Sequence, residues 1–344
     1  NNYTGNMQKD WTFMQNSNEY TIAKLKIFSV CNEISFNSNK CSNSCDIDLS
    51  GVAHGDTLIY DYYSNKLSQK QIPFRLNTDI SKPNFIIALT GQSNSQGCNA
   101  MYDINNKFDQ PHERIYSFNS TTQTWEIADL NTESLGSYWH KHKGWQSFAF
   151  HFAKRLVEAY DDIRPGIINL GVGGQSIARW VKYDSLSKWS DYNKNIVDKQ
   201  SAVEGDIYDL HVEKINQAMY QLNIENQIID VVCWHQGEAD GYSVDSSYYS
   251  ESINKVIQQY RSLSYCNSQT PFIVGETTGA DIGTDIGWEA RNVQLRNLNV
   301  DADPYTKCVS CSDLETFDND GIHFTAQSQR NMGSLYFKAF RDCY

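Results

Sequence analysis

The chain has 344 residues, of which 40% are hydrophobic, 13% aromatic and only 20% charged, so it can bury a sizeable core and is not a disordered chain. Its formal net charge is −12. Nucleic acid is excluded as a partner, because phosphate backbones are bound by clustered Lys and Arg. No apolar run approaches the roughly 20 residues that are needed to span a bilayer.

The sequence changes character near residue 80. Before it, residues 20–30 alternate apolar and polar side chains, and residues 56–63 form a second strand-like run. We interpret residues 1–80 as a small N-terminal β-rich accessory region for carbohydrate binding or attachment. A β extension packed on the main domain explains the pattern equally well. Because the chain starts at Asn1, without Met or a signal-peptide segment, we expect a mature form or a fragment.

Residues 81–344 alternate strand-like and helical segments, which is typical of parallel strands with crossover helices. Apolar runs of buried-strand length occupy residues 85–90, 166–170, 228–234 and 272–275. Apolar side chains recur at helical spacing at Trp145, Phe148, Phe152 and Leu156, at Val212, Ile215, Met219 and Leu222, at Ile253, Val256, Ile257 and Tyr260, and at Met332, Leu335 and Ala339 after a capping Thr325. The predicted fold class is α/β, a three-layer α/β/α sandwich with a parallel sheet.

Nine cysteines are many for a cytosolic enzyme of this size. Seven of them cluster towards the two ends of the chain: Cys31, Cys41, Cys45, Cys266, Cys308, Cys311 and Cys343. Such clusters indicate disulfides and an oxidising compartment, so we expect a secreted or surface-exposed, extracellular protein. Cys98 and Cys233 are expected to be reduced and buried.

A zinc site is the alternative explanation of the cysteines. Cys41-x3-Cys45 and Cys308-x2-Cys311 have ligand-like spacings. The two halves would belong to different regions, however, and no His joins them. We therefore predict no metal.

Functional groups in an open parallel sheet gather beyond the carboxyl ends of the strands. The first strand ends in Gly91–Gly97 (GQSNSQG), where glycine permits a tight strand-to-helix turn and Ser93 stands at a helix N-terminus. Backbone N–H groups at that position favour developing negative charge. A Ser after Gly is common in turns, and this segment is not the G-x-S-x-G elbow of α/β-hydrolases.

The second and third strands end in two further segments. In Gly171–Ile177 (GVGGQSI), the glycines let a backbone N–H approach a substrate oxyanion. The spacing is not that of a phosphate-binding P-loop, and no Lys follows. Trp234–Asp240 (WHQGEAD) is a dense polar group that emerges from an apolar run.

The fourth segment, Asp320-Gly-Ile-His323, precedes the last predicted helix. On a turn, three-residue spacing brings a carboxylate to the imidazole Nδ1–H. The carboxylate then sets the tautomer and leaves Nε2 free to face a serine.

These four motifs, in this order, resemble the sialate O-acetylesterase and acetyl xylan esterase branch of the SGNH-hydrolase superfamily, over roughly residues 82–342. The resemblance implies a flavodoxin-like sheet and a carbohydrate O-acetylesterase that acts on an acetylated glycan through an acetyl-enzyme intermediate, without a cofactor. It implies Ser93 as nucleophile, His323 as general base and acid, and Asp320 as the orienting carboxylate.

The resemblance also implies an oxyanion hole made of the Ser93 N–H, a glycine N–H from the second motif, expected to be that of Gly174, and the Gln236 side-chain amide. Many other SGNH enzymes have Asn where Gln236 stands. The residues expected to brace these loops are Gln92, Glu238 and Asp240.

Indole rings stack on sugar rings, and Trp139, Trp180 and Trp189 are candidates for such contacts, with Trp180 expected to bind substrate. Half-buried packing explains each of them as well.

Two other functions remain open. One is an esterase for small non-carbohydrate esters, which the lack of an apolar lid-like segment disfavours. The other is a non-catalytic carbohydrate-binding or virion-surface adhesin, which the complete Ser, Gln, Asp and His set disfavours.

Overall fold

The chain divides into two compact units, Asn1–Pro73 with Tyr344, and Phe74–Cys343. The boundary predicted at residue 80 falls a few residues later. The computed structural model describes seven short strands within the first 78 residues and, after them, residues 79–139, 143–182, 205–224, 227–240, 246–278, 288–298 and 303–344.

The first unit contains two small sheets. One is antiparallel, in the order β1 (Asn2–Tyr3), β4 (Ile34–Asn37) and β5 (Lys40–Ser42). The other has the order β2 (Trp11–Thr12), β3 (Lys24–Lys26), β6 (Thr57–Asp61) and β7 (Lys66–Gln69). Strands β3 and β6 lie within the two segments that the sequence predicts to be strands. The side chains of Cys31, Cys41 and Cys45 lie outside the described residues.

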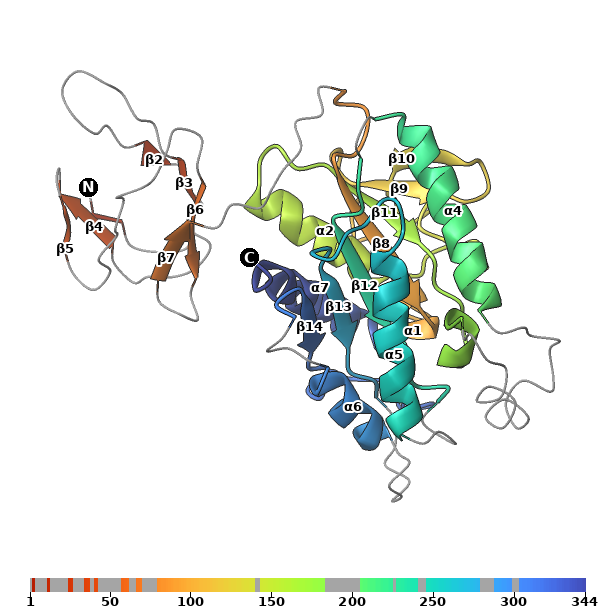
Figure 1. Cartoon of the computed structure of the whole chain (residues 1–344). Coiled ribbons are helices and arrows are strands. Elements are labelled where there is room, and N and C mark those ends of the chain that lie inside the picture. The colour runs from red at the N-terminus through yellow and green to blue at the C-terminus, as the bar shows by residue number, and fades with distance from the viewer. Residues whose placement is uncertain are drawn as a thin grey trace. The chain divides into compact units, whose positions relative to one another are not determined.

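The second unit is built on a seven-stranded sheet (Figure 1). Its strands are β8 (Phe85–Gly91), β9 (Tyr116–Asn119), β10 (Thr124–Ile127), β11 (Pro165–Asn169), β12 (Val231–His235), β13 (Phe272–Gly275) and β14 (Thr306–Val309). The spatial order is β10-β9-β11-β8-β12-β13-β14, and β10 alone runs antiparallel to its neighbour. Numbered along the chain from β8 to β14 without the β9–β10 hairpin, the parallel strands have the order 2-1-3-4-5 of flavodoxin-like folds.

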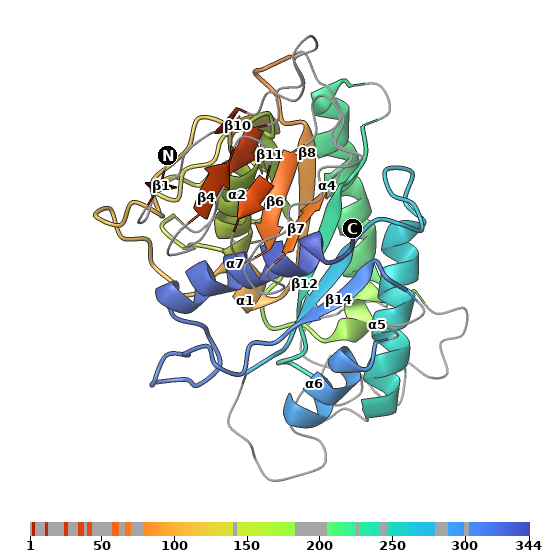
Figure 2. The ribbon, with the colours of Figure 1, turned by 90° about the vertical axis from the view of Figure 1, so that its left-hand side faces the viewer.

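Helices cover both faces of this sheet (Figures 1 and 2). They are α1 (Ser93–Gln96), α2 (Phe148–Ala159), the 3₁₀ turn η1 (Ile177–Trp180), α4 (Asp206–Leu222), α5 (Ser246–Arg261), α6 (Trp288–Arg296) and α7 (Ala326–Arg341). On one face, Phe85 of β8 meets Phe340 of α7 edge-on, with ring centroids 5.4 Å apart. On the other, Ile86 shares a core with Ile215 of α4 and Ile253 of α5. The predicted three-layer sandwich is confirmed.

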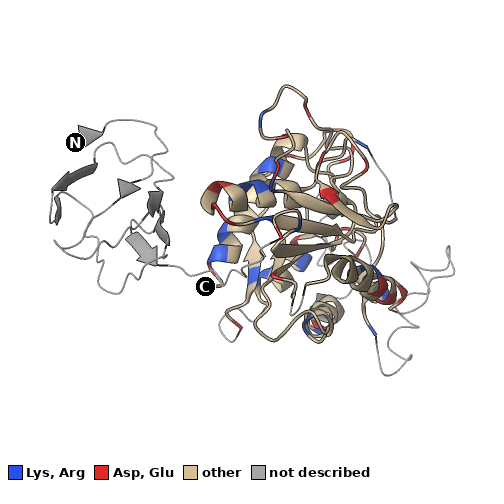
Figure 3. Ribbon diagram, turned by 90° about the horizontal axis from the view of Figure 1, so that it is seen from above, with Lys and Arg blue, Asp and Glu red and all other residues tan. Residues whose placement is uncertain are grey.

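Local sequence explains where the two helices of the first face begin. The Ser147 side chain caps α2 by accepting the Ala149 N–H, and Thr325 caps α7 by accepting the Ser328 N–H, as predicted for Thr325. Charged residues lie mostly on the helices and loops rather than in the strands (Figure 3). Among the described residues, no helix is long and apolar enough to cross a membrane.

The six described cysteines are all free thiols, so none of the disulfides expected among the C-terminal cysteines is formed. Cys311 and Cys343 are instead buried in the packed core, where burial raises their pKa. Cys233 is buried, as expected. Cys98 differs from the prediction, because it is only half-buried beside the segment that follows Ser93.

Candidate active site

The candidate site lies at the topological switch point of the sheet, beyond the carboxyl end of the central strand β8. Strand β8 has β11 on one side and β12 on the other, so the connections on its two sides diverge at this edge, which is where open α/β sheets bind their ligands. The ends of β8 and β12 approach so closely that a Cβ on Gly91 would collide with the His235 carbonyl. Gly91 also has φ +127°, which only glycine adopts without strain.

Ser93 is the first residue of α1, directly after that turn. The Gln92 N–H donates to the His235 carbonyl oxygen at 2.9 Å, which joins the turn to the end of β12. Gly97 ends α1 in a left-handed conformation, with φ 76°. The half-buried Ser93 side chain is therefore held on a short, well-defined turn at the edge of the sheet.

The structure brings Ser93 to His323, which lies 230 positions later in the sequence, and to its neighbour Asp320. His323 Nε2 lies 2.9 Å from Ser93 Oγ, and His323 Nδ1 lies 2.8 Å from Asp320 Oδ2. Asp320 Oδ1 accepts the backbone N–H groups of Ile322 and His323, at 2.9 and 3.0 Å. Since a carboxylate only accepts, Nδ1 carries a proton, and in the neutral imidazole Nε2 is the acceptor that faces the serine hydroxyl.

The surroundings of the imidazole favour its protonated form. The Cys98 sulfur, as an acceptor that favours the charged imidazolium, raises the pKa of His323, and the hydrogen bond and negative charge of Asp320 raise it further, to about 9, against the opposing effect of burial. Burial acts to raise the pKa of Asp320, but the backbone and side-chain donors of His323 and the Ile322 N–H outweigh it and lower that pKa. The pair can therefore hold a proton that leaves Ser93.

Asn94 holds the His323 turn against the nucleophile turn, a role that the motif reading did not assign. Its side-chain amide donates to the Ile322 carbonyl at 3.0 Å, and its side-chain oxygen accepts the Phe324 N–H at 3.1 Å. The same amide donates to Glu238 Oε1 at 2.6 Å. The available sequence signal was its place next to the candidate nucleophile, within GQSN; the structure shows the side chain fully buried.

Glu238 holds the Asn94 side chain in place by accepting its amide N–H. Burial acts to raise the pKa of Glu238, but the neighbouring His235 imidazole, whose Nε2 lies 3.4 Å from Oε1, and the hydrogen bond from Asn94 outweigh it and lower the pKa, so the carboxylate stays charged. The Gln92 side-chain oxygen accepts the Ala239 N–H at 3.3 Å. The turn that carries Ser93 is thus tied to the segment after β12 through both its side chain and its backbone.

Asp240 connects that segment to the glycine-rich loop after β11. Its carboxylate accepts the Ser176 hydroxyl at 2.6 Å and the Ile177 N–H at 2.9 Å. Its backbone oxygen accepts Arg291 Nη2 at 2.7 Å. Asp240 is fully buried, so this loop is held in place by hydrogen bonds that water does not reach.

Gln236 does not present the oxyanion donor that the motif implies. Its Nε2 donates to Asp240 Oδ2 and, at 3.1 Å, to the Gln175 carbonyl, so both amide hydrogens are engaged. The side chain is 0% exposed. In this structure Gln236 instead fixes the backbone that follows Gly174, because a buried amide is stable only when acceptors take its hydrogens.

Two backbone donors remain for an oxyanion. The N–H groups of Ser93 and Gly174 donate to no acceptor within the described part of the chain. Gly174 is exposed, has φ +69°, and a Cβ there would meet no atom within 4 Å. The space over this loop is open to a ligand, and the left-handed backbone is held by the contacts of Asp240 and Gln236.

The tryptophan predicted to bind substrate lies in the core instead. Trp180 is 0% exposed and packs edge-on against Trp234, with ring centroids 5.5 Å apart, so it offers no face to a sugar. Trp139 is 42% exposed. It lies two residues after Ser137, whose hydroxyl accepts Gln96 Nε2 of α1 at 2.9 Å. Trp189 lies outside the described residues.

No group of three His, Cys, Asp or Glu side chains within the described residues is arranged to hold a metal ion. Half of the alternative zinc site, Cys41 and Cys45, lies outside the residues whose side chains are described. The other half, Cys308 and Cys311, consists of free thiols.

Comparison with known proteins agrees with the fold and the motifs. Residues 83–342 match the family described as carbohydrate esterase, sialic acid-specific acetylesterase. No curated protein matches the chain significantly. A protein of known structure from Arabidopsis thaliana is 20% identical, with a TM-score of 0.55, over 75% of this chain and 98% of its own. NanS is 16% identical, with a TM-score of 0.53, over 74% of this chain and 96% of its own.

At these identities the two structures show a shared fold. The family match spans most of the chain, so the chain belongs to the sialic acid-specific acetylesterase family of carbohydrate esterases. It is an SGNH-type α/β hydrolase and an acetylesterase.

Proposed function

We propose that this enzyme removes acetyl groups from an acetylated glycan through a Ser93–His323–Asp320 triad and an acetyl-enzyme intermediate. The observation that carries the proposal is the continuous chain from Ser93 Oγ to His323 Nε2, at 2.9 Å, and from His323 Nδ1 to Asp320, at 2.8 Å. A nucleophile within hydrogen-bond reach of a base, itself oriented by a third group, is what acyl transfer requires.

In the first step, Ser93 Oγ attacks the acetyl carbonyl carbon while its proton passes to His323 Nε2. The negative charge that develops on the carbonyl oxygen is received by the N–H groups of Ser93 and Gly174. The resulting imidazolium donates its Nε2 proton to the departing sugar oxygen. The C–O bond to the sugar breaks, and the acetyl group remains on Ser93.

In the second step, water takes the place of the sugar hydroxyl. His323 Nε2 accepts a proton from this water, whose oxygen attacks the acetyl carbon, and the same proton then returns to Ser93 Oγ as acetate leaves. Asp320 stays ionised throughout and stabilises each imidazolium. The carboxylate's three hydrogen bonds to the 322–323 turn keep the ring aligned in both steps.

The family description favours an O-acetylated sialic acid as the sugar. Trp139 supports a sugar acceptor, because its indole is exposed and it follows, by two residues, Ser137, which accepts a hydrogen bond from Gln96 of the helix that begins with Ser93. The competing reading, an esterase for small non-carbohydrate esters, predicts no preference for a glycan over an aryl acetate.

The test combines one variant with a substrate panel. Ser93→Ala is expected to lower kcat for 4-nitrophenyl acetate by on the order of 10⁶, because the nucleophile is removed. The wild-type enzyme should release acetate from O-acetylated sialic acid with a higher kcat/KM than from acetylated xylan. Undiminished activity of Ser93→Ala contradicts the mechanism. A preference for acetylated xylan contradicts the substrate while leaving the triad intact.

A further inference from the structure

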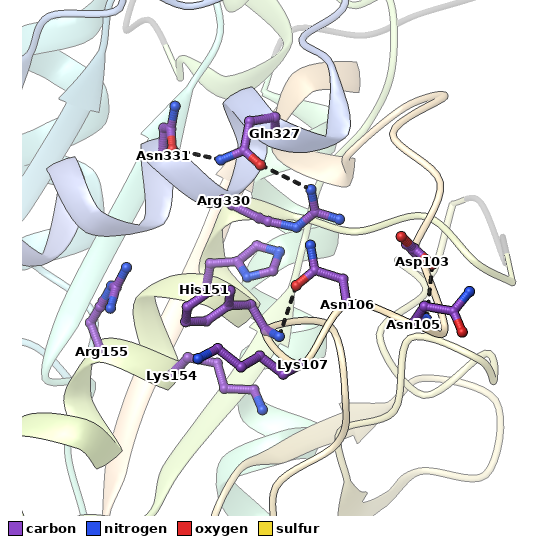
Figure 4. A pocket seen from close by; sticks show the side chains of 11 residues that line it. Asp103, Asn105, Asn106, Lys107, His151, Lys154, Arg155, Gln327, Arg330 and Asn331 are labelled. Carbon is purple, nitrogen blue, oxygen red and sulfur yellow. Dashed lines mark hydrogen bonds between the residues drawn. The ribbon is translucent and has the colours of Figure 1, made fainter.

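A pocket of about 520 Å³ opens on the helical layer formed by α2 and α7, outside the triad (Figure 4). The loop that leaves α1 forms one wall, at residues 103–108. Helix α2 forms the second wall with His151, Lys154 and Arg155, and α7 forms the third with Gln327, Arg330 and Asn331. None of these residues takes part in the chemistry proposed above.

The pocket is basic although the chain as a whole is acidic. Lys107, Lys154, Arg155 and Arg330 line it, whereas Asp103 is its single lining carboxylate. The chain carries a formal net charge of −12. Two of the four cations are paired with carboxylates, Arg330 with Asp109 and Arg155 with Glu158, so the excess positive charge that attracts anions comes from the two lysines.

Two of these cations are held rigidly. Asp109, 1% exposed, accepts Arg330 Nε at 2.8 Å and Nη2 at 2.6 Å, a bidentate pair that sets the plane of the guanidinium. Arg155 donates through Nε to Ser334 at 3.0 Å and through Nη1 to Glu158 at 2.7 Å, which leaves Nη2 available. Side chains fixed before binding lose little entropy when a ligand arrives.

The two lysines supply the excess positive charge of the pocket, although the negative charges of Glu158 and Asp109 act on Lys154. Neither Lys107 nor Lys154 forms an ion pair with any described residue. The Lys154 ammonium donates to the Gln110 carbonyl, and burial lowers its pKa. Lys107 is exposed and lies over the Phe108 ring, 5.1 Å from the centroid, while Arg155 lies 5.6 Å from the same centroid. Cation–π contacts with the Phe108 ring therefore place both cations at the pocket.

Neutral hydrogen-bonding groups complete the lining. Asn105, Asn106, Gln327 and Asn331 bring side-chain amides. The oxygens of the last three already accept from Phe108, Arg330 and Gln327, but each amide keeps N–H donors and its oxygen a second lone pair. Such groups pair with hydroxyls, which also both donate and accept. A simple inorganic anion has no hydroxyl groups to pair with these amides, whereas an acidic sugar presents a carboxylate and several hydroxyls together.

The pocket adjoins the machinery of the proposed reaction through the covalent chain. Its first wall follows α1 directly, and α7 begins three residues after His323. On the inner side of α7, Gln329 Nε2 donates to the Asn94 carbonyl at 3.1 Å. The outer side of the same helical turns faces the pocket with Gln327 and Arg330 (Figure 4).

We infer that this pocket is a second binding site, for a saccharide that carries a carboxylate. The preference for an anion rests on the lining residues alone. The choice of a saccharide also rests on the proposed function, in which the substrate is a glycan.

Binding is measured on the wild-type chain by isothermal titration at low ionic strength, with D-glucuronic acid, D-glucose and sodium sulfate as probes. Glucuronate is expected to bind at least about tenfold more tightly than either of the others. The double variant Lys107→Gln/Lys154→Gln is expected to lose about tenfold in glucuronate affinity. Lys214→Gln, on α4 at the opposite face of the sheet, removes the same charge and should have no effect.

Equal binding of glucose would show that the cations are not used, and equal binding of sulfate would show a plain anion site. Either result overturns the inference, as does unchanged glucuronate affinity in the double variant with an unchanged melting temperature. Turnover of 4-nitrophenyl acetate by the double variant should match the wild type. Failure of the proposed function would appear in the Ser93→Ala assay and leave the titration readable.

Discussion

Two carboxylates serve the active-site end of the sheet under opposite conditions. Asp320 lies on the His323 turn with its side chain 27% exposed. It accepts hydrogen bonds from the backbone N–H groups of Ile322 and His323 on the same turn. Asp240 is 0% exposed. It joins its own segment, through Gln236, to the glycine-rich loop at Ser176 and to α6 at Arg291. A group that handles protons must reach solvent and substrate, whereas a group that positions a loop is strongest where water is absent.

We therefore expect substitution of Asp320 to lower mainly kcat, and substitution of Asp240 to lower mainly the free energy of unfolding. Asp320→Asn is expected to lower kcat by up to about 10⁴, because an amide at this position favours the wrong imidazole tautomer. The free energy of unfolding should fall by about 1 kcal/mol or less, because the side chain is partly exposed and an amide oxygen can still accept from the turn. Initial rates with 4-nitrophenyl acetate and urea unfolding measure the two quantities.

Asp318 provides the matched control, since it is exposed and stands two residues before Asp320. Asp318→Asn should leave both quantities unchanged. A large loss in Asp318→Asn together with normal activity in Asp320→Asn would transfer the orienting role to Asp318.

Asp240→Asn should show the reverse pattern. The neutral amide cannot accept from Ser176, Ile177 and Gln236 together, so at least one buried donor is left without a partner. We expect the free energy of unfolding to fall by about 1–3 kcal/mol. A urea midpoint equal to that of the wild type would contradict the positioning role.

Gln236→Ala distinguishes positioning from direct participation. If Gln236 only holds Asp240 and the Gln175 carbonyl, kcat should fall by about tenfold, less than the 10²–10³ that typically follows loss of an oxyanion donor. The comparison is made on kcat with 4-nitrophenyl acetate. A loss of 10²–10³ at unchanged stability would return Gln236 to the oxyanion hole.

The smallest expected effect concerns pH. His323 must be neutral to accept the serine proton, so kcat/KM should rise with pH through the raised pKa of about 9. The Cys98 side chain contributes the largest share of that rise. Cys98→Ala should therefore shift the rise of kcat/KM to lower pH without changing the maximal kcat/KM at high pH. Cys266→Ala, a half-buried thiol elsewhere, is the control. An unmoved limb would show that Cys98 has no influence on the imidazole.

Most of the sheet could be predicted because buried strands are short apolar runs. The segments predicted at 85–90 and 272–275 correspond to β8 and β13 within one residue. The β9–β10 hairpin and β14 were not predicted. Strand β10 carries Thr124 and Glu126 at the sheet edge, and β14 contains Lys307, so neither has a continuous apolar run.

The order of the motifs determined, from the sequence alone, which residues meet at the site, since the carboxyl ends of parallel strands share one edge. Side-chain orientation and pairing were decided only by the tertiary structure. Trp180 turned into the core, and Gln236 turned to Asp240. Motif spacing does not encode these outcomes. A buried ring or amide adopts the one direction in which neighbours from distant segments fill its surroundings and satisfy its hydrogen bonds.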